Sequence, residues 1–169
     1  MATTYTLIQP AVVVGSGGAT DITFSAIPAT YTDLVVKLSS RTNRANAVDF
    51  LQINFNGSAA SFTARGIEGN GASAASYTDT VFIGATSGNS ATASTFGNLE
   101  IYIPNYSGST NKSYSADSVS ETNGTTAYTE LVAGLWSNTA AITSIKLLSA
   151  TANNFLQYST AYLYGVSNA

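Results

Sequence analysis

The side chains of this 169-residue chain that could do acid–base chemistry are carboxylates, because the sequence contains neither histidine nor cysteine. Without imidazole or thiol, Ser–His and Cys–His nucleophile pairs, His- or thiolate-ligated zinc sites and disulfides are excluded. Glycoside hydrolysis would need two facing carboxylates. The acidic residues are instead dispersed along the sequence: Asp21, Asp33, Asp49, Glu68, Asp79, Glu100, Asp117, Glu121 and Glu130. The sequence therefore predicts a protein without enzymatic activity.

Two motifs that could bind ligands are incomplete. Residues 15–18, Gly-Ser-Gly-Gly, have the glycine content of a phosphate-binding loop, but no Gly-Lys-Ser/Thr follows and the next segment is strand-like. No Asp-x-Asp-x-Asp-Gly run for calcium is present, so an ion could be held only at a loop or a subunit axis with help from backbone carbonyls. We therefore expect no cofactor and no metal site.

Charged residues make up only 9% of the chain, and the net charge is −3. The six basic residues are scattered, so no basic patch that would attract phosphates is expected. Residues 1–9 contain no basic residue, and the apolar run 11–14 ends at Gly15, which predicts neither a secretion signal nor a membrane segment. Nucleic acid and membrane are therefore not expected as partners.

Ten tyrosines and one tryptophan are the remaining side chains with binding potential. Tyrosine has an apolar face and a polar tip, which suits a carbohydrate-binding or adhesive surface. Packing is the favoured interpretation, because several tyrosines lie within or beside predicted strands: Tyr5, Tyr102, Tyr114, Tyr128 and Tyr158. Trp136 ends an apolar strand, where a core or subunit-contact role is favoured over ligand contact.

An alternation of apolar and polar residues predicts the elements that must position these side chains. Leu34, Val36 and Leu38 share one face of a strand whose other face is largely polar. Strands predicted in this way cover residues 21–25, 33–39, 51–55, 81–83, 99–103, 112–119, 128–136, 142–148 and 156–166. No window has the caps and periodicity of a stable helix.

Residues 66–94 are rich in glycine, alanine and serine around a short apolar core at 81–83. They are interpreted as a loop-rich surface excursion, with long loops on either side of one strand. About nine short strands joined by polar turns predict one all-β domain over residues 1–169, an antiparallel β-sandwich. A jelly roll is the expected version, and an immunoglobulin-like sandwich is the main alternative.

Several phrases of the sequence, taken together, resemble small proteins encoded by marine phages, in particular the cyanophage-like virion structural proteins of the capsid-decoration and tail-fibre type. The phrases are Tyr-Thr-Leu-Ile at 5–8, Val-Gly-Ser-Gly-Gly-Ala at 14–19, Phe-Ser-Ala-Ile-Pro-Ala-Thr-Tyr-Thr-Asp-Leu at 24–34, Phe-Asn-Gly-Ser at 55–58, Ile-Pro-Asn-Tyr-Ser-Gly-Ser-Thr-Asn-Lys at 103–112, Val-Ala-Gly-Leu-Trp-Ser-Asn-Thr-Ala-Ala-Ile-Thr-Ser-Ile at 132–145 and Gln-Tyr-Ser-Thr-Ala-Tyr-Leu-Tyr-Gly at 157–165.

The resemblance implies a non-enzymatic phage virion structural protein, made in the host cytoplasm. Relatives also occur as terminal modules of larger fibres, whereas this single domain shows no shaft or anchor segment, so a capsid decoration protein or short head fibre bound to the outer shell is expected. The implied partners are the phage major capsid protein, or another virion protein, and further copies of the chain, with a homotrimer expected by analogy. The alternative is a tail-fibre or tail-tip receptor-binding module that recognises a host surface glycan through residues within 66–94.

The last predicted strand, residues 156–166, has no charged residue on either face. Tyr158, Tyr162 and Tyr164 share one face, and a half-exposed strand would normally show a polar face there. We therefore expect either a neighbouring subunit or a second layer of the same chain to cover the tyrosines. The predicted subunit-contact residues are Tyr158, Tyr162, Tyr164 and Trp136.

Overall fold

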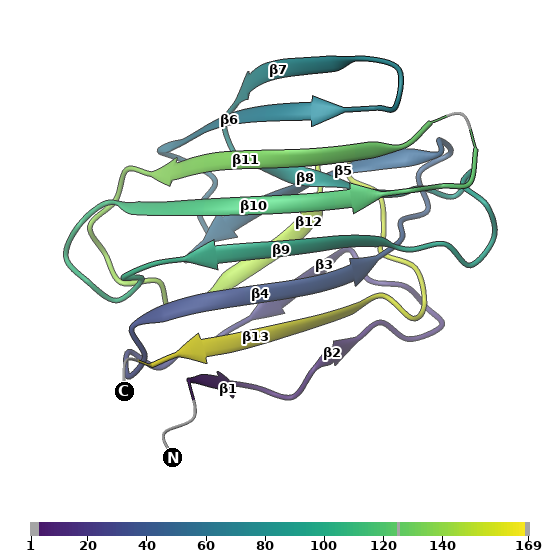
Figure 1. Cartoon of the computed structure of the whole chain (residues 1–169). Helices are drawn as coiled ribbons and strands as arrows, with labels where there is room; N and C mark the ends of the chain where they lie inside the picture. The colour runs from purple at the N-terminus through teal and green to yellow at the C-terminus, as the bar shows by residue number, and fades with distance from the viewer. Residues whose placement is uncertain (1–3, 125, 168–169) are drawn as a thin grey trace.

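The structure, a computed structural model, describes residues 4–124 and 126–167. These residues form thirteen strands and no helix, arranged as two antiparallel sheets that lie face to face (Figure 1). No helix long and apolar enough to span a bilayer occurs within these ranges. The predicted all-β antiparallel sandwich is confirmed, and its jelly-roll version stays a prediction.

The two sheets differ in size, with nine strands in one and four in the other. Across the large sheet the order is β1 (Tyr5–Leu7), β13 (Thr160–Val166), β4 (Asp33–Ser40), β9 (Gly97–Ile103), β10 (Lys112–Ser120), β11 (Tyr128–Trp136), β6 (Phe62–Gly69) and β7 (Ala74–Asp79), and β2 (Val12–Val13) also pairs with β13. Across the small sheet the order is β3 (Asp21–Phe24), β12 (Ile145–Ser149), β5 (Val48–Phe55) and β8 (Phe82–Ser87).

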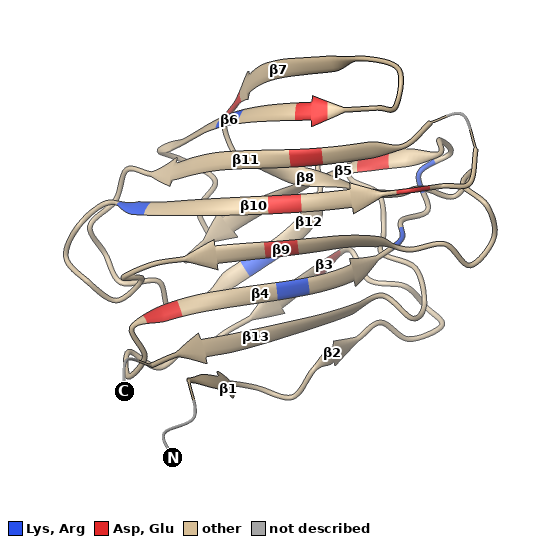
Figure 2. Cartoon of the chain, viewed as in Figure 1, with Lys and Arg blue, Asp and Glu red and all other residues tan. Residues whose placement is uncertain are grey.

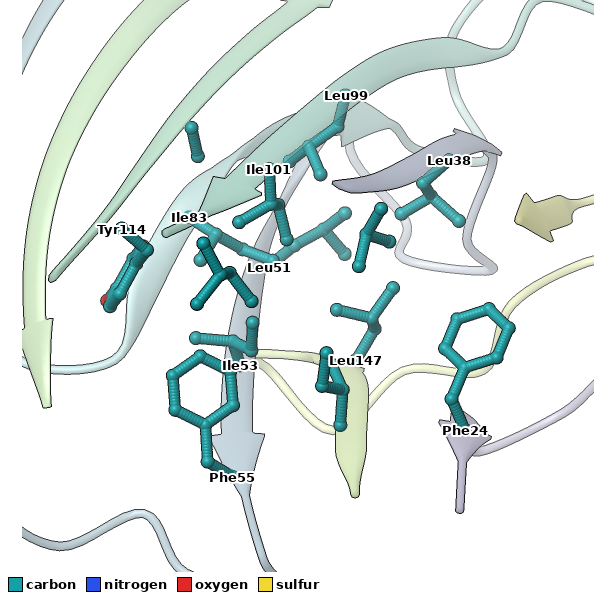
Figure 3. Close-up of a cluster of buried hydrophobic side chains, with 14 of the residues drawn as sticks. Phe24, Leu38, Leu51, Ile53, Phe55, Ile83, Leu99, Ile101, Tyr114 and Leu147 are labelled. Carbon is teal, nitrogen blue, oxygen red and sulfur yellow. The ribbon is translucent and has the colours of Figure 1, made fainter. Parts of the chain in front are cut away.

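The core lies between the sheets and is built by the alternation that the sequence shows. In β10, every second side chain from the first to the last residue is buried and the others are exposed. Leu51, Ile53 and Phe55 of β5 point toward the large sheet, where they meet residues such as Ile101 of β9 (Figure 3). Each fully buried aliphatic or aromatic side chain of this kind contributes about 1.5–3 kcal/mol relative to an exposed one.

Residues 66–94 differ from the loop-rich excursion that the sequence predicts. Most of residues 66–79 belongs to the hairpin of β6 and β7, and residues 82–87 form the buried strand β8. The small side chains of β7 mark an edge strand, which needs no apolar face because most of it is exposed. Its turn is closed by Asn70, whose Oδ1 accepts hydrogen bonds from the backbone N–H groups of Ala72 and Ser73. Only the loop after β8 fits the prediction.

Tyrosine rings packed over glycines explain why glycine is tolerated inside the strands. Gly66 of β6 is the register partner of Tyr77 of β7, and a Cβ at Gly66 would lie 2.1 Å from the Tyr77 Cζ atom. Gly134 of β11 and Tyr114 of β10 form a second pair of this kind, with 1.9 Å to Cζ. Each ring fills the space that the missing side chain leaves, and its position is thereby fixed.

Candidate functional site

Two of the predicted contact residues, Tyr162 and Tyr164, lie half-buried on the outer face of the large sheet. They face outward because Ala161 and Leu163 of the same strand are fully buried in the core. Their rings are stacked with centroids 6.4 Å apart, and Tyr5 of β1 meets the Tyr164 ring at 6.2 Å. Figure 1 shows no described strand in front of this face, so a second layer of the described chain does not cover the tyrosines.

The other two predicted contact residues lie elsewhere. Tyr158 lies in the turn before β13, where its φ is 73° and its side chain is 68% exposed. The structure corrects the prediction that Trp136 is a subunit-contact residue. Trp136 is 2% exposed, and its ring stacks on Phe62 at a centroid distance of 6.0 Å and meets Phe55 at 5.5 Å. It shares the inward face of β11 with the buried Val132. Trp136 is therefore a core residue and offers no surface to another subunit.

Exposed aliphatic side chains form a second feature of the same outer face, which we call the outer-face patch (Ile67, Val119 and Leu131). Ile67 of β6 and Leu131 of β11 are register partners and are 59% and 54% exposed. Val119 of β10 pairs with Thr129, two residues from Leu131, and is also exposed. Adjacent apolar side chains of this kind on three neighbouring strands are typical of a contact surface.

A cleft opens where the chain crosses from the large sheet to the small sheet, between β7 and β8. It has a volume of about 290 Å³. We call it the inter-sheet cleft, and its lining residues are Phe50, Gln52, Glu68, Tyr77, Thr78, Asp79, Phe82 and Ala150. The ring of Phe82 meets that of Tyr77 at 5.1 Å and that of Phe50 at 5.6 Å, edge to face in both cases. Three rings from three strands thus form one wall.

Two carboxylates that are far apart in the sequence come together beside this cleft. Glu68 of β6 and Glu130 of β11 are register partners, and Figure 2 shows acidic residues on the neighbouring strands β6 and β11. Glu130 is 3% exposed, and burial together with the Glu68 charge raises its pKa to about 7. The Tyr77 hydroxyl lies 3.5 Å from the Glu130 Oε2 atom, and burial beside these acidic groups raises the pKa of Tyr77 as well.

Two polar side chains of the inter-sheet cleft, Glu68 and Gln52, lack partners within the described part of the chain, whereas Asp79 accepts hydrogen bonds from Thr80. Among the described residues, neither the Glu68 carboxylate nor the Gln52 amide makes a side-chain hydrogen bond or an ion pair. Over the same ranges, the Glu130 Oε1 atom is buried without a hydrogen-bond partner. Buried and half-buried polar groups are usually satisfied, so a cluster that lacks partners indicates a site that meets a ligand or water.

Other buried charges are accounted for by structural contacts. Asp49 accepts hydrogen bonds from the hydroxyls of Thr42, Ser149 and Thr151, each at 2.8 Å. The Lys112 ammonium donates to backbone carbonyls, and burial lowers its pKa. No group of three or more acidic side chains in residues 4–124 and 126–167 is placed to hold a metal ion.

Sequence reasoning did not find the inter-sheet cleft. Phe50 lies within β5 and Phe82 begins β8, both as ordinary apolar residues, and nothing in the local sequence indicates that they line one cleft with Tyr77. The pairing of Glu68 with Glu130 depends on the register of β6 against β11, which joins segments about sixty residues apart in the chain. Comparison with protein-family models, with curated proteins and with solved structures finds no match for this chain.

Proposed function

We propose that this chain is a non-enzymatic structural protein of a phage virion, bound to the outer shell as a capsid decoration protein or short head fibre. The resemblance of its strand and turn segments to such proteins supports a location on the virus particle. The observation that carries the binding role is the outer face of the large sheet, with its stacked tyrosines at one end and the outer-face patch at the other.

Both ends of this face suit contact with protein. Tyr162 and Tyr164 provide apolar area with polar tips, a combination enriched at interfaces. Ile67 and Leu131 provide adjacent exposed aliphatic side chains, which are unusual on the surface of a monomer. One end would join copies of the chain, a trimer by analogy, and the other would rest on the major capsid protein.

Decoration of this kind acts by mass action. A protein that binds only the assembled shell stabilises the shell by an amount that grows with occupancy, about 2.7 kcal/mol per site at a concentration one hundred times Kd. No bond is made or broken, which agrees with a chain that has no imidazole or thiol.

Imaging of intact virions with the protein labelled tests the proposal. We expect many copies distributed over the shell. If only a few copies were found, all at the tail, the decoration role would be wrong and receptor binding would be the better assignment. Purified protein should also release no reducing sugar from host polysaccharide, and a turnover that disappears in Glu68→Gln or Glu130→Gln would overturn the non-enzymatic assignment.

The second candidate function is recognition of a host surface glycan, as a tail-fibre or tail-tip module. The inter-sheet cleft favours it, because aromatic rings beside hydrogen-bonding side chains without partners are typical of small-ligand sites. Binding of the full chain to arrayed host glycans tests this function separately from the position on the particle.

A further inference from the structure

The rings of the inter-sheet cleft are held in place before any ligand arrives. Tyr77 rests over Gly66, where no side chain competes for the space, and Phe82 is 7% exposed at the base of the cleft. Phe50 and Tyr77 are half-buried, so part of each ring is open to solvent. A ligand that stacks on them therefore orders few side chains, which lowers the entropic penalty of binding.

Hydrogen-bonding groups surround these rings. The Glu68 carboxylate and the Gln52 amide make no side-chain hydrogen bond within the described part of the chain. The Asp79 carboxylate is exposed, and its Oδ1 atom accepts hydrogen bonds from the adjacent Thr80. Carboxylate oxygens accept hydrogen bonds from neighbouring hydroxyl groups, and an amide both donates and accepts. Apolar rings with polar acceptors at their margin match a ligand that has C–H faces and several hydroxyls.

Charge limits the ligand further. The Glu68 and Asp79 carboxylates line the cleft and would repel an anionic ligand. The Phe50 ring already has a cationic partner, because the Arg44 guanidinium lies 5.5 Å from its centre in a cation–π contact, and this disfavours a second cation on the same ring. The volume of about 290 Å³ lies at the lower limit of ligand pockets, which limits the bound part to one small ring.

We propose that the inter-sheet cleft binds one neutral pyranose unit of a glycan, with its C–H face on Tyr77 and Phe50 and its hydroxyls donating to Glu68 and Asp79. This inference rests on the second proposed function, glycan recognition, and names its site and ligand class. Gln52 completes the contact from β5, so residues of both sheets hold the sugar. Sugars that carry a carboxylate are rejected by the acidic side chains.

The test is an NMR titration of the ¹⁵N-labelled full chain with methyl glucopyranoside, methyl galactopyranoside and methyl mannopyranoside, with methyl glucuronide as the anionic probe. We expect saturable shifts at Phe50, Tyr77 and Phe82 with at least one neutral glycoside and none with the glucuronide. Glu68→Gln and Gln52→Ala, which leave the rings intact, should each weaken binding about tenfold. Glu100→Gln and Asn54→Ala, a carboxylate of the outer face and a neighbour of Gln52 on β5, are the matched controls and should bind as the unmodified chain does.

The outcomes separate the site from the function. Shifts that cluster outside the cleft, or full affinity in Glu68→Gln and Gln52→Ala, would overturn the site while glycan recognition stands. Tighter binding of the glucuronide, or of tetramethylammonium as a cationic probe, would overturn the neutral-sugar class. Absence of binding both to the glycosides and to arrayed host glycans would overturn the inference together with the second proposed function.

Discussion

Glu130 of β11 stands directly opposite Glu68 of β6 in the antiparallel register, and the Glu130 side chain is only 3% exposed. Two ionised carboxylates in a cross-strand pair destabilise a sheet, and burial adds to the energy needed to ionise the inner one. The pair therefore retains a proton on Glu130 up to a pKa of about 7, well above the ordinary value of 4.5. The stability of the β6–β11 contact is consequently linked to pH.

The free energy of unfolding should fall as pH rises from about 5 to about 8, because the folded chain binds more protons than the unfolded chain over this window. Glu130 alone accounts for roughly 3 kcal/mol of this change. Urea unfolding at a series of pH values measures it. Glu130→Gln should flatten the slope and be the more stable protein at the upper end, whereas Glu121→Gln, an exposed control, should keep the slope. If the pH dependence of the unfolding free energy were unchanged in Glu130→Gln, another group would be responsible for it.

Tyr162→Arg combined with Tyr164→Arg should convert an oligomer into a folded monomer. Both side chains lie on the outer face, and Tyr162 is the register partner of Lys37, so the added charges repel a partner without entering the core. Light scattering measures the mass of the particle in solution, and circular dichroism shows whether the variant is folded. Ser113→Arg with Ser115→Arg, on the same outer face but on β10, should leave the oligomer intact. Loss of the fold in the tyrosine variant would show that these tyrosines are needed for the sandwich itself.

Gly134→Ala should destabilise the chain by about 1–3 kcal/mol, because the new Cβ would lie 1.9 Å from the Cζ atom of the buried Tyr114. Thermal and denaturant unfolding measure the change. Gly17→Ala, whose Cβ meets nothing within 4 Å, is the control and should be close to neutral. Equal stability of the two variants would mean that the Tyr114 ring moves aside without loss.

Arg41→Met should loosen the loop that follows β8. The buried Arg41 guanidinium donates to four backbone carbonyls of this loop, at 2.8 Å to Thr92, 2.9 Å to Ala91 and 3.0 Å to Asn89 and Thr95. Each carbonyl that loses its donor while buried costs about 1–3 kcal/mol unless water replaces the guanidinium. Hydrogen exchange should accelerate in residues 88–95 and stay unchanged in Arg65→Met, an exposed control. Unchanged protection in Arg41→Met would show that the loop holds its shape by its own turns.

The alternation of side chains was enough to predict most of the strands. The sequence predicts a strand over residues 128–136, and β11 has the same bounds, because Glu130, Val132 and Trp136 alternate with exposed residues over the full length. The two-sheet arrangement followed from the number of such segments. The sequence does not predict the hairpin of β6 and β7, because the inward face of β6 contains the small residues Ala64 and Gly66, and β7 is an exposed edge strand that needs no apolar alternation.

The site required information that no local pattern contains. The inter-sheet cleft depends on which strands become neighbours, and its rings come from β5, β7 and β8. The sequence places Trp136 among the contact residues because large aromatic side chains are common both in cores and at interfaces. Its burial against Phe62 and Phe55 shows that it is a core residue. The tyrosines of β13 were placed correctly on one face by their spacing, whereas Tyr158 lies beyond the start of that strand.

The position of β13 has a consequence for biosynthesis. It lies between β1 and β4 in the large sheet. Of the described strands, β1 is translated first and β13 last, so β1 and β4 can be joined only after β13 has been made. Until residue 166 leaves the ribosome, β4 has an open edge on one side and β1 has no partner in the sheet. A nascent chain stalled before that point would present β4 to other chains as a template for strand pairing, and the large sheet can be completed only after β13 has been synthesised, at the slow rate typical of pairing between distant segments.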